Sequence, residues 1–316
     1  MKFMKAVQVS TPGGEFELVQ REIPEPAKGQ VRIKVSACGV CHGDDVVKSG
    51  GHYPGIEYPR IPGHEIIGVI EKIGAGVEGY EIGQRVGVGW PAGITYDGGF
   101  AEYMITSAQE LVQIPEDLNS IEAAPLLCAG VTTFDALKNS GAKPGDIVAI
   151  QGVGGLGHLA IQYAKKMGLK TVAISRGTDK RELAEKLGAQ VYIDTESTDV
   201  AKELQKLGGA KVILATAPNN KAISVLVDGL GFDGKLVIVA GIEGPIQVYG
   251  NQLLMGRRSI QGWIPTGHNQ SKEDTLKFSL LANVRPLIET FPLEQAALAY
   301  EKMMTAKIRF RAVLTI

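Results

Sequence analysis

A glycine-rich stretch, Gln151-Gly152-Val153-Gly154-Gly155-Leu156-Gly157, most constrains how this chain folds. It follows a short apolar run over residues 147–150 and precedes a segment with apolar residues at helical spacing. A second apolar run over 171–174 comes next, so strand, turn, helix and strand fill roughly the 30 residues of a dinucleotide-binding βαβ unit.

Each glycine of this turn has a physical role in such a unit. Gly152 permits the tight turn, Gly154 lets backbone N–H groups approach a pyrophosphate, and Gly157 lets the helix pack close to the strand. The helix N-terminus then presents its partial positive charge to the phosphates. A bare glycine motif also occurs in flexible surface loops, but the flanking strand and helix favour a dinucleotide site formed by residues 152–157.

The composition describes an ordinary globular protein. The chain has 316 residues, of which 44% are hydrophobic and 21% charged, so we expect two domains with normal cores. A formal net charge of -1 favours neither nucleic acid nor an acidic membrane as a partner. No apolar run reaches the ~18 residues of a membrane helix, and the first residues lack a signal-peptide core. Three cysteines do not make a disulfide framework, so we expect a cytoplasmic protein.

The hydrophobic pattern changes near residue 146. Residues 4–36 and 66–114 contain short alternating runs typical of strands, followed by a helix opening at Ser120 and one ending near Ser140. From Asp146 strands at 147–151, 171–175, 190–193, 211–215 and 235–240 alternate with helices; the tail has helices at 272–282 and 293–307 and a strand at 311–316. We predict an α/β protein, with a doubly wound parallel sheet domain at 129–264 inserted in a β-rich domain at 1–128 and 265–316.

Residues able to ligate a metal occur in three separate places. They are Cys41, then His64 with Glu65, and finally Cys128 just before the dinucleotide unit. Two thiolates, an imidazole and an open fourth position form a catalytic zinc site, which would polarise an alcohol or carbonyl oxygen. Asp44 is expected to hold the far nitrogen of His64.

Some of these residues also fit other kinds of site. Cys38-x-x-Cys41 also fits a redox pair, but it does not start a helix in a βαβ unit. It would be half of a zinc ribbon only if a second CxxC existed. Cys38 is expected to be a small buried side chain. His52, His158 and His268 are expected to be solvated or packing residues, and we assign them no catalytic or metal-binding role.

The motifs CGVCHGD, PGHE, PLLCAG and GVGGLG, in this order, resemble those of the zinc-dependent medium-chain alcohol dehydrogenases, and the resemblance covers essentially the whole chain. It implies a GroES-like catalytic domain split around a Rossmann domain, and a homodimer or homotetramer. It implies one zinc on Cys41, His64 and Cys128, with Glu65 as a nearby or alternating ligand. It further implies that the cofactor contacts His42, Thr132, Leu156 and Arg311, and that Trp90 lines the substrate pocket.

The chain departs from this family in two places. Pro91-Ala92-Gly93-Ile94 stands where relatives carry a four-cysteine structural zinc lobe, so no structural zinc is expected. Gly43 stands where relatives have the Ser or Thr that starts the proton relay, and Val46 where some have a relay histidine. Either water substitutes or turnover is impaired, and we expect Gly43→Ser or Gly43→Thr to raise alcohol oxidation by restoring a hydroxyl.

The second strand of the dinucleotide unit indicates the cofactor. An acidic residue at its end usually binds the ribose 2′-hydroxyl, but here Ser175 stands there, followed by Arg176 and Lys180. Arginine suits a phosphate, so NADP is favoured. In the alternative, Arg176 and Lys180 are solvated charges and NAD binds.

The residues therefore favour a zinc-dependent alcohol dehydrogenase or aldehyde reductase, in which hydride passes between a primary alcohol or aldehyde and a nicotinamide. One alternative is a zinc-free NADPH reductase of quinone or enoyl type. The other is a dinucleotide-binding scaffold inactivated at Gly43.

Overall fold

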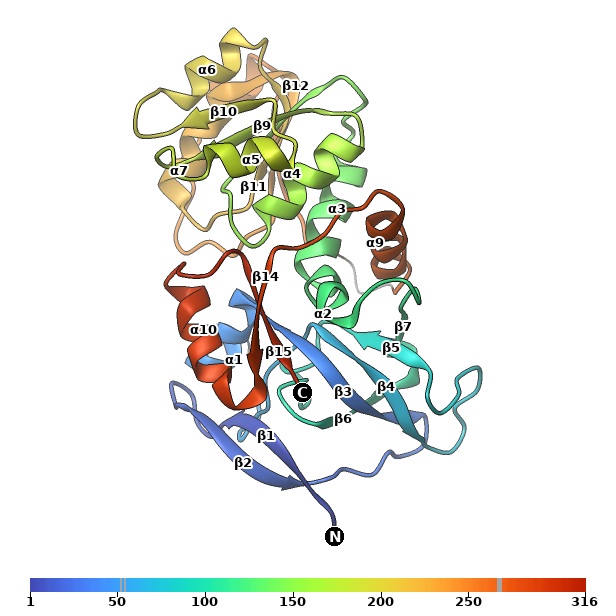
Figure 1. Cartoon of the computed structure of the whole chain (residues 1–316). Helices are drawn as coiled ribbons and strands as arrows, with labels where there is room; N and C mark the ends of the chain where they lie inside the picture. Colours follow the sequence, from blue (N-terminus) through green and yellow to red (C-terminus); the bar gives the residue numbers. More distant parts are fainter. Residues whose placement is uncertain (52, 54, 266–268) are drawn as a thin grey trace. The chain divides into compact units, whose positions relative to one another are not determined.

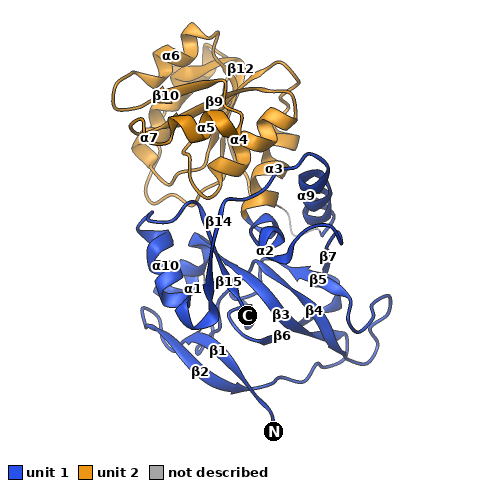
Figure 2. Ribbon diagram, in the orientation of Figure 1, with its two compact units in different colours: residues 1–128, 267–316 blue, residues 129–266 orange. Residues whose placement is uncertain are grey.

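The structure is a computed structural model that describes residues 1–51, 53, 55–265 and 269–316. Predictions about His52 and His268 lie outside these residues. The chain forms two compact units: residues 1–128 with 267–316 form unit 1, and residues 129–266 form unit 2 (Figures 1 and 2).

Unit 1 is built on a seven-stranded sheet in the order β14-β15-β3-β4-β5-β7, with β6 paired to β3, beside a separate β1-β2 hairpin. Its strands are β1 (Phe3–Val9), β2 (Phe16–Glu22), β3 (Gln30–Val40), β4 (Ile66–Ile73), β5 (Arg85–Val88), β6 (Tyr103–Ser107), β7 (Val112–Gln113), β14 (Ile288–Pro292) and β15 (Arg311–Thr315). Its helices are η1 (His42–Asp44), α1 (Asp45–Ser49), η2 (Ala108–Glu110), α2 (Ser120–Ala123), η3 (Ala124–Leu127), α9 (Asn269–Leu281), η5 (Leu293–Gln295) and α10 (Ala296–Met304).

The long strand β3 is the centre of unit 1. Val31, Ile33 and Val35 are buried at alternate positions, as a strand with one face on a core requires. The last strand of the chain, β15, pairs antiparallel with the end of β3, so the C-terminal residues complete the sheet that the N-terminal residues begin. The helix expected over 293–307 is a 3-10 turn followed by α10, which buries Ala296, Ala299 and Met303.

Unit 2 is a six-stranded parallel sheet in the order β10-β9-β8-β11-β12-β13, with helices between its strands. The strands are β8 (Ile147–Gln151), β9 (Lys170–Ser175), β10 (Val191–Asp194), β11 (Ala210–Ala215), β12 (Leu230–Ile238) and β13 (Ser259–Gly262). The helices are α3 (Ala129–Asn139), α4 (Gly157–Lys166), α5 (Arg181–Leu187), α6 (Val200–Lys206), α7 (Asn220–Ser224), η4 (Val225–Gly229) and α8 (Gly250–Leu254).

The sheet order of unit 2 reverses beside β8, where the chain moves outward through β9 and β10 and returns to place β11 on the other side. Ligands of such sheets bind at the carboxyl ends of the strands beside this reversal. The predicted fold class, a doubly wound parallel sheet with a β-rich domain, is confirmed. Strand β12 starts at Leu230, earlier than expected, because its first residue pairs with Ala210 before a register shift.

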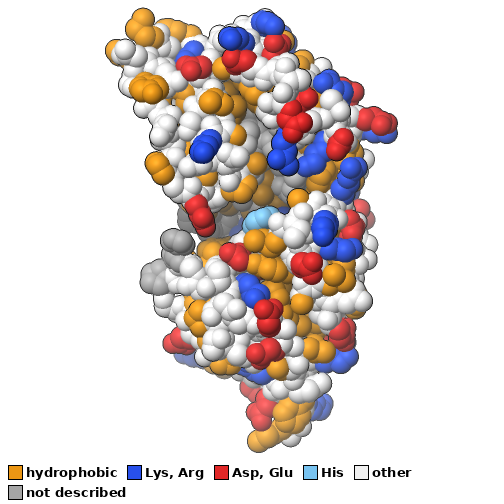
Figure 3. Space-filling model, turned by 90° about the vertical axis from the view of Figure 1, so that its left-hand side faces the viewer, with side chains coloured by type: hydrophobic (Ala, Val, Ile, Leu, Met, Phe, Trp, Pro, Cys, Tyr) orange, Lys and Arg blue, Asp and Glu red, His pale blue; other side chains and the backbone are white. Residues whose placement is uncertain are grey.

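The surface agrees with the balanced composition. Figure 3 shows basic and acidic side chains interspersed over the face that it presents. Among the described residues, no helix is long and apolar enough to cross a membrane.

Candidate metal centre and dinucleotide site

The four predicted ligands converge in unit 1. Cys41 follows β3, His64 and Glu65 precede β4, and Cys128 follows η3. One potential ligand atom from each lies within 4.8 Å of the others. The two sulfur atoms of Cys41 and Cys128 are 3.7 Å apart. Two Zn–S bonds of about 2.3 Å at a tetrahedral angle would place the sulfurs about 3.8 Å apart, so the thiol pair fits a zinc ion.

The turn after β3 holds the first of these ligands in place. Cys41 caps η1, and its sulfur lies 3.5 Å from the backbone nitrogen of Gly43. The backbone N–H of Cys41 donates to Oδ2 of Asp44 at 2.8 Å. The other Asp44 oxygen lies 3.0 Å from Nδ1 of His64, at ion-pair distance. Asp44 therefore joins Cys41 and His64, in the position that we expected for the carboxylate behind a ligating histidine.

The electrostatics of this cluster also suit a cation. Burial disfavours the imidazolium form, but Asp44 and the Cys41 sulfur raise the pKa of His64 well above its usual value. Contact with the Cys128 sulfur lowers the pKa of Cys41, with further help from His64 and Arg311. Nε2 of His64 is buried and makes no well-formed hydrogen bond within the described part of the chain. A metal ion would take the place of the proton and use this nitrogen.

Glu65 has a different partner from the other three residues. Its side chain is fully buried, and Oε1 forms an ion pair with Nη2 of Arg311. Burial raises the pKa of Glu65 to about 7, although Arg311 opposes that shift. Arg311 is only 3% exposed. The structure thus gives Arg311 a carboxylate partner that sequence reasoning missed, and its predicted phosphate contact stays a prediction.

Trp90 and Gly43 lie against the imidazole of His64. The rings of Trp90 and His64 are 5.4 Å apart between centroids and meet edge to face at 76°. A Cβ atom added to Gly43 would lie 2.8 Å from Cε1 of His64 and 3.6 Å from Cζ3 of Trp90. This close approach opposes the expectation that Gly43→Ser raises turnover, which stays a prediction, because a side chain at 43 would need the buried His64 ring to shift.

The short segment over residues 91–94, where the resemblance led us to expect that a structural zinc lobe is missing, is a folded turn. Ala92 and Ile94 are buried, and the backbone N–H groups of Ile94 and Thr95 donate to the carbonyl of Pro91. A Cβ on Gly93 would lie 2.7 Å from the nitrogen of Gly63, directly before His64. This turn thus packs on the segment that carries a predicted ligand, His64.

The glycine-rich turn in unit 2 has the geometry expected of a dinucleotide site. It joins β8 to α4, and Gly152 has a positive φ of 95° that favours glycine. A Cβ on Gly157 would lie 1.8 Å from the carbonyl oxygen of Gly152, whereas a Cβ on Gly154 would meet no atom within 4 Å. Gly157 is thus needed for packing, and the backbone at Gly154 is open to a ligand. His158 is buried with Nδ1 2.9 Å from the Gly154 carbonyl, consistent with a packing histidine.

Sequence reasoning missed Thr216, which directly follows β11, the neighbour of β8 in the sheet, and hydrogen-bonds to the glycine-rich turn. Its hydroxyl donates to the carbonyl of Gln151 at 2.8 Å and lies 3.2 Å from that of Gly152. A small polar residue at the carboxyl end of a strand beside the switch point was the available signal. Thr132 and Leu156 are half-buried, and His42 is exposed. Their predicted cofactor contacts stay predictions.

The residues predicted to select the cofactor lie at the carboxyl end of β9. Ser175 is its last residue, Lys180 precedes α5, and Arg176 is exposed. Nε of Arg176 lies 3.7 Å from Oε1 of Glu196, just beyond β10. The end of β9 itself has no carboxylate, but the pairing of β10 with β9 brings Glu196 close to Arg176 from 20 residues further along the chain.

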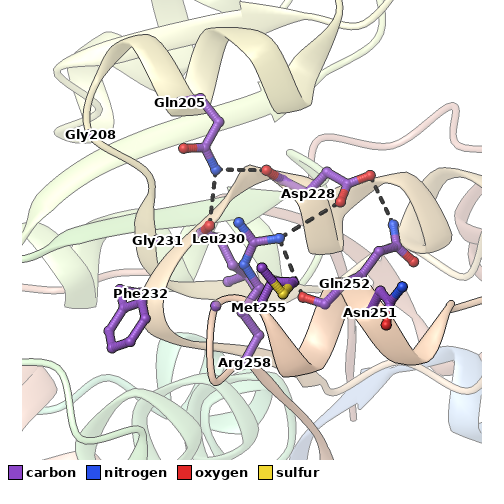
Figure 4. A pocket seen from close by; sticks show the side chains of 11 residues that line it. Gln205, Gly208, Asp228, Leu230, Gly231, Phe232, Asn251, Gln252, Met255 and Arg258 are labelled. Atoms are coloured by element: carbon purple, nitrogen blue, oxygen red, sulfur yellow. Dashed lines mark hydrogen bonds and ion pairs between the residues drawn. The ribbon is translucent and has the colours of Figure 1, made fainter.

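Unit 2 also contains an open pocket of about 500 Å³ among α6, η4, β12 and α8 (Figure 4). Gln205 donates to the carbonyls of Asp228 and Leu230, and Gln252 donates to the Asp228 carboxylate. Arg258 lies 3.7 Å from the same carboxylate. None of the predicted site residues lines it.

The fold and the two sites define a class: enzymes that pair a doubly wound dinucleotide domain with a metal centre on a β-rich domain. Comparison with known proteins narrows this class. Residues 27–116 match the alcohol dehydrogenase GroES-like domain, and residues 155–280 match the zinc-binding dehydrogenase domain. The chain belongs to the zinc-dependent medium-chain alcohol dehydrogenase family.

Individual relatives match over nearly the full length. The alcohol dehydrogenase patD of Penicillium expansum is 41% identical over 326 residues, which cover 96% of this chain and 95% of the relative. An alcohol dehydrogenase of Geobacillus stearothermophilus is 36% identical over 338 residues, or 98% of each. Among solved structures, the cobalt- and zinc-bound thermostable alcohol dehydrogenase of Pyrobaculum aerophilum matches with a TM-score of 0.87 and 26% identity, covering 100% of both chains.

Proposed function

We propose that this protein is an alcohol dehydrogenase or aldehyde reductase that uses one zinc ion, on Cys41, His64 and Cys128, and prefers NADP(H). The observation that carries the proposal is the convergence of these residues, with two sulfurs at 3.7 Å and an imidazole backed by Asp44. A bound zinc supplies a Lewis acid for the substrate oxygen.

The protein residues then have three tasks. Asp44 orients the His64 ring so that Nε2 faces the cluster, because the carboxylate holds the opposite nitrogen. Trp90 packs on that ring and forms one wall of the substrate space, which favours primary alcohols and aldehydes, including aromatic ones. Gly43 offers no hydroxyl, so an alcohol proton leaves through water.

The cofactor contacts are assigned to unit 2. The backbone at residues 152–157 and the N-terminus of α4 would bind the pyrophosphate. Ser175, Arg176 and Lys180 would receive the 2′-phosphate, with Arg176 leaving its exposed pairing with Glu196. His42 and Arg311 keep their predicted phosphate contacts as part of this proposal.

The proposal is tested by two measurements on one preparation. Elemental analysis after dialysis should give one zinc per chain, and an aldehyde panel should be reduced faster with NADPH than with NADH. A metal-free protein that reduces quinones or enoyl compounds would be a zinc-free reductase. A zinc-loaded protein without turnover would be an inactive scaffold.

Two further properties belong to the same proposal. We infer a homodimer or homotetramer, because unit 2 exposes large apolar side chains such as Tyr249, Leu254 and Met255. Light scattering after gel filtration would measure the mass. A cytoplasmic location is supported by three unpaired cysteines, and cell fractionation would test it.

A further inference from the structure

Gly39 lies on β3 at a point where the backbone is held from both sides. It pairs with Val313 of β15, and its N–H donates to the carbonyl of Glu65 at 2.9 Å. Since β3 is flanked by β4 and β15, neither side of the strand is free to shift. Any side chain added at 39 must therefore be accommodated by its neighbours.

The neighbour that fills the space over Gly39 is the carboxylate of Glu65. A Cβ atom on Gly39 would lie 1.8 Å from Oε2, 2.8 Å from Cδ and 2.9 Å from Cβ of Glu65. Real Cβ atoms do not approach other atoms this closely, so the carboxylate rests on the bare glycine. Oε2 makes no hydrogen bond within the described residues, while Oε1 is held by Arg311.

The placement of this carboxylate matters because Glu65 lies beside the predicted metal position. A carboxylate that joined two thiolates and an imidazole would complete four protein ligands, the closed arrangement of a structural zinc site. A catalytic site keeps the fourth position for substrate. Gly39 leaves space for the Glu65 carboxylate, and Arg311 pairs with it, so the carboxylate is held next to the fourth metal position without occupying it.

We propose that Gly39 is a positioning residue. By lacking a side chain, it lets Glu65 stay paired with Arg311 and leaves the fourth metal position open to substrate. This inference rests on the proposed zinc function. A carboxylate displaced from Gly39 has no route to solvent, because Glu65 is fully buried. A buried anion needs a cation, and the cation other than Arg311 would be the metal.

The test replaces zinc by Co²⁺, whose visible spectrum reports coordination, and uses imidazole as a probe of the open position. Wild-type protein should bind imidazole with a spectral shift. Gly39→Ala should retain one Co²⁺ but bind imidazole at least tenfold more weakly, with a similar loss in kcat. Adding Glu65→Asp to Gly39→Ala should restore imidazole binding, because the shorter side chain withdraws from the new methyl group. Gly262→Ala, on strand β13 where a Cβ would meet no atom within 4 Å, is the matched control and should behave as wild type.

Imidazole binding to Co²⁺-loaded Gly39→Ala with wild-type affinity would overturn the proposal. If Gly39→Ala is too unstable to load, a stability cycle decides. Gly39→Ala should shift the urea midpoint strongly in the wild-type background and much less in Glu65→Gly, which removes both the carboxylate and the Cβ that would lie 2.9 Å from the added atom. Equal shifts in both backgrounds would show that the contact between residue 39 and the Glu65 side chain does not cause the loss of stability. A wild-type protein that binds no metal would instead reject the proposed function.

Discussion

The metal cluster of unit 1 and the glycine-rich turn of unit 2 are built in opposite ways. The turn comes from one local segment, and its properties follow from missing side chains and exposed backbone groups at residues 152–157. The cluster collects side chains from separate segments and holds them by buried charges, with Arg311 joined to Glu65 across 246 positions. A local backbone site tolerates change outside its few contacts, whereas a buried charged site depends on every partner.

The largest expected effect comes from removing a metal ligand. Cys41→Ala and His64→Ala should each abolish zinc binding and lower kcat/KM by roughly a thousandfold or more, because the metal supplies several kcal/mol of transition-state stabilisation. Elemental analysis and steady-state kinetics measure this, with circular dichroism to verify folding. Wild-type activity in either variant would remove the residue from the site.

Two glycines of the dinucleotide turn should respond differently to the same methyl group. Gly157→Ala places a Cβ 1.8 Å from the Gly152 carbonyl and should destabilise unit 2 by about 1–3 kcal/mol or more. Gly154→Ala meets no atom within 4 Å and should leave the stability within about 0.5 kcal/mol while weakening cofactor binding. Urea unfolding and cofactor titration distinguish the two, and similar losses of stability would contradict the packing role of Gly157.

Substitution of Gly43 should displace the His64 ring from its position in the predicted metal site and lower the rate. Gly43→Ala and Gly43→Ser should both lower kcat, by about tenfold, because either Cβ collides with the buried His64 ring. The alanine variant separates the steric effect from that of a hydroxyl. A rate above wild type for serine alone would show that the ring moves aside and that the hydroxyl restores a proton relay.

The smallest effects concern the exposed cofactor-selecting residues. Arg176→Ala should lower kcat/KM for NADP(H) by about tenfold and leave NAD(H) nearly unchanged, since a charge-assisted contact contributes about 1.5–3 kcal/mol before screening. Ser175→Asp should reverse the preference. Glu196→Gln should raise kcat/KM for NADP(H) by about two- to fivefold, because it frees Arg176 from an exposed ion pair. Preference for NAD(H) in the wild type would reject the assignment.

The sequence by itself determined the architecture, the dinucleotide turn and the identities of the residues that gather in the cluster. These follow from patterns that can be read along the chain, namely the period of apolar residues, glycines at fixed spacing and short motifs with metal-ligating residues in a characteristic order. Even the pairing of Asp44 with His64 was accessible, because ligating histidines need such a partner.

Only the tertiary structure decided what surrounds those residues. The carboxylate over Gly39, the imidazole beside Gly43, the ion pair of Glu65 with Arg311, and the approach of Glu196 to Arg176 all depend on contacts between segments far apart in the sequence. The sequence does not show whether the space beside a glycine Cα is open to solvent or occupied by a buried carboxylate. Steric space and buried charge are properties of close packing between distant segments, and no local pattern records them.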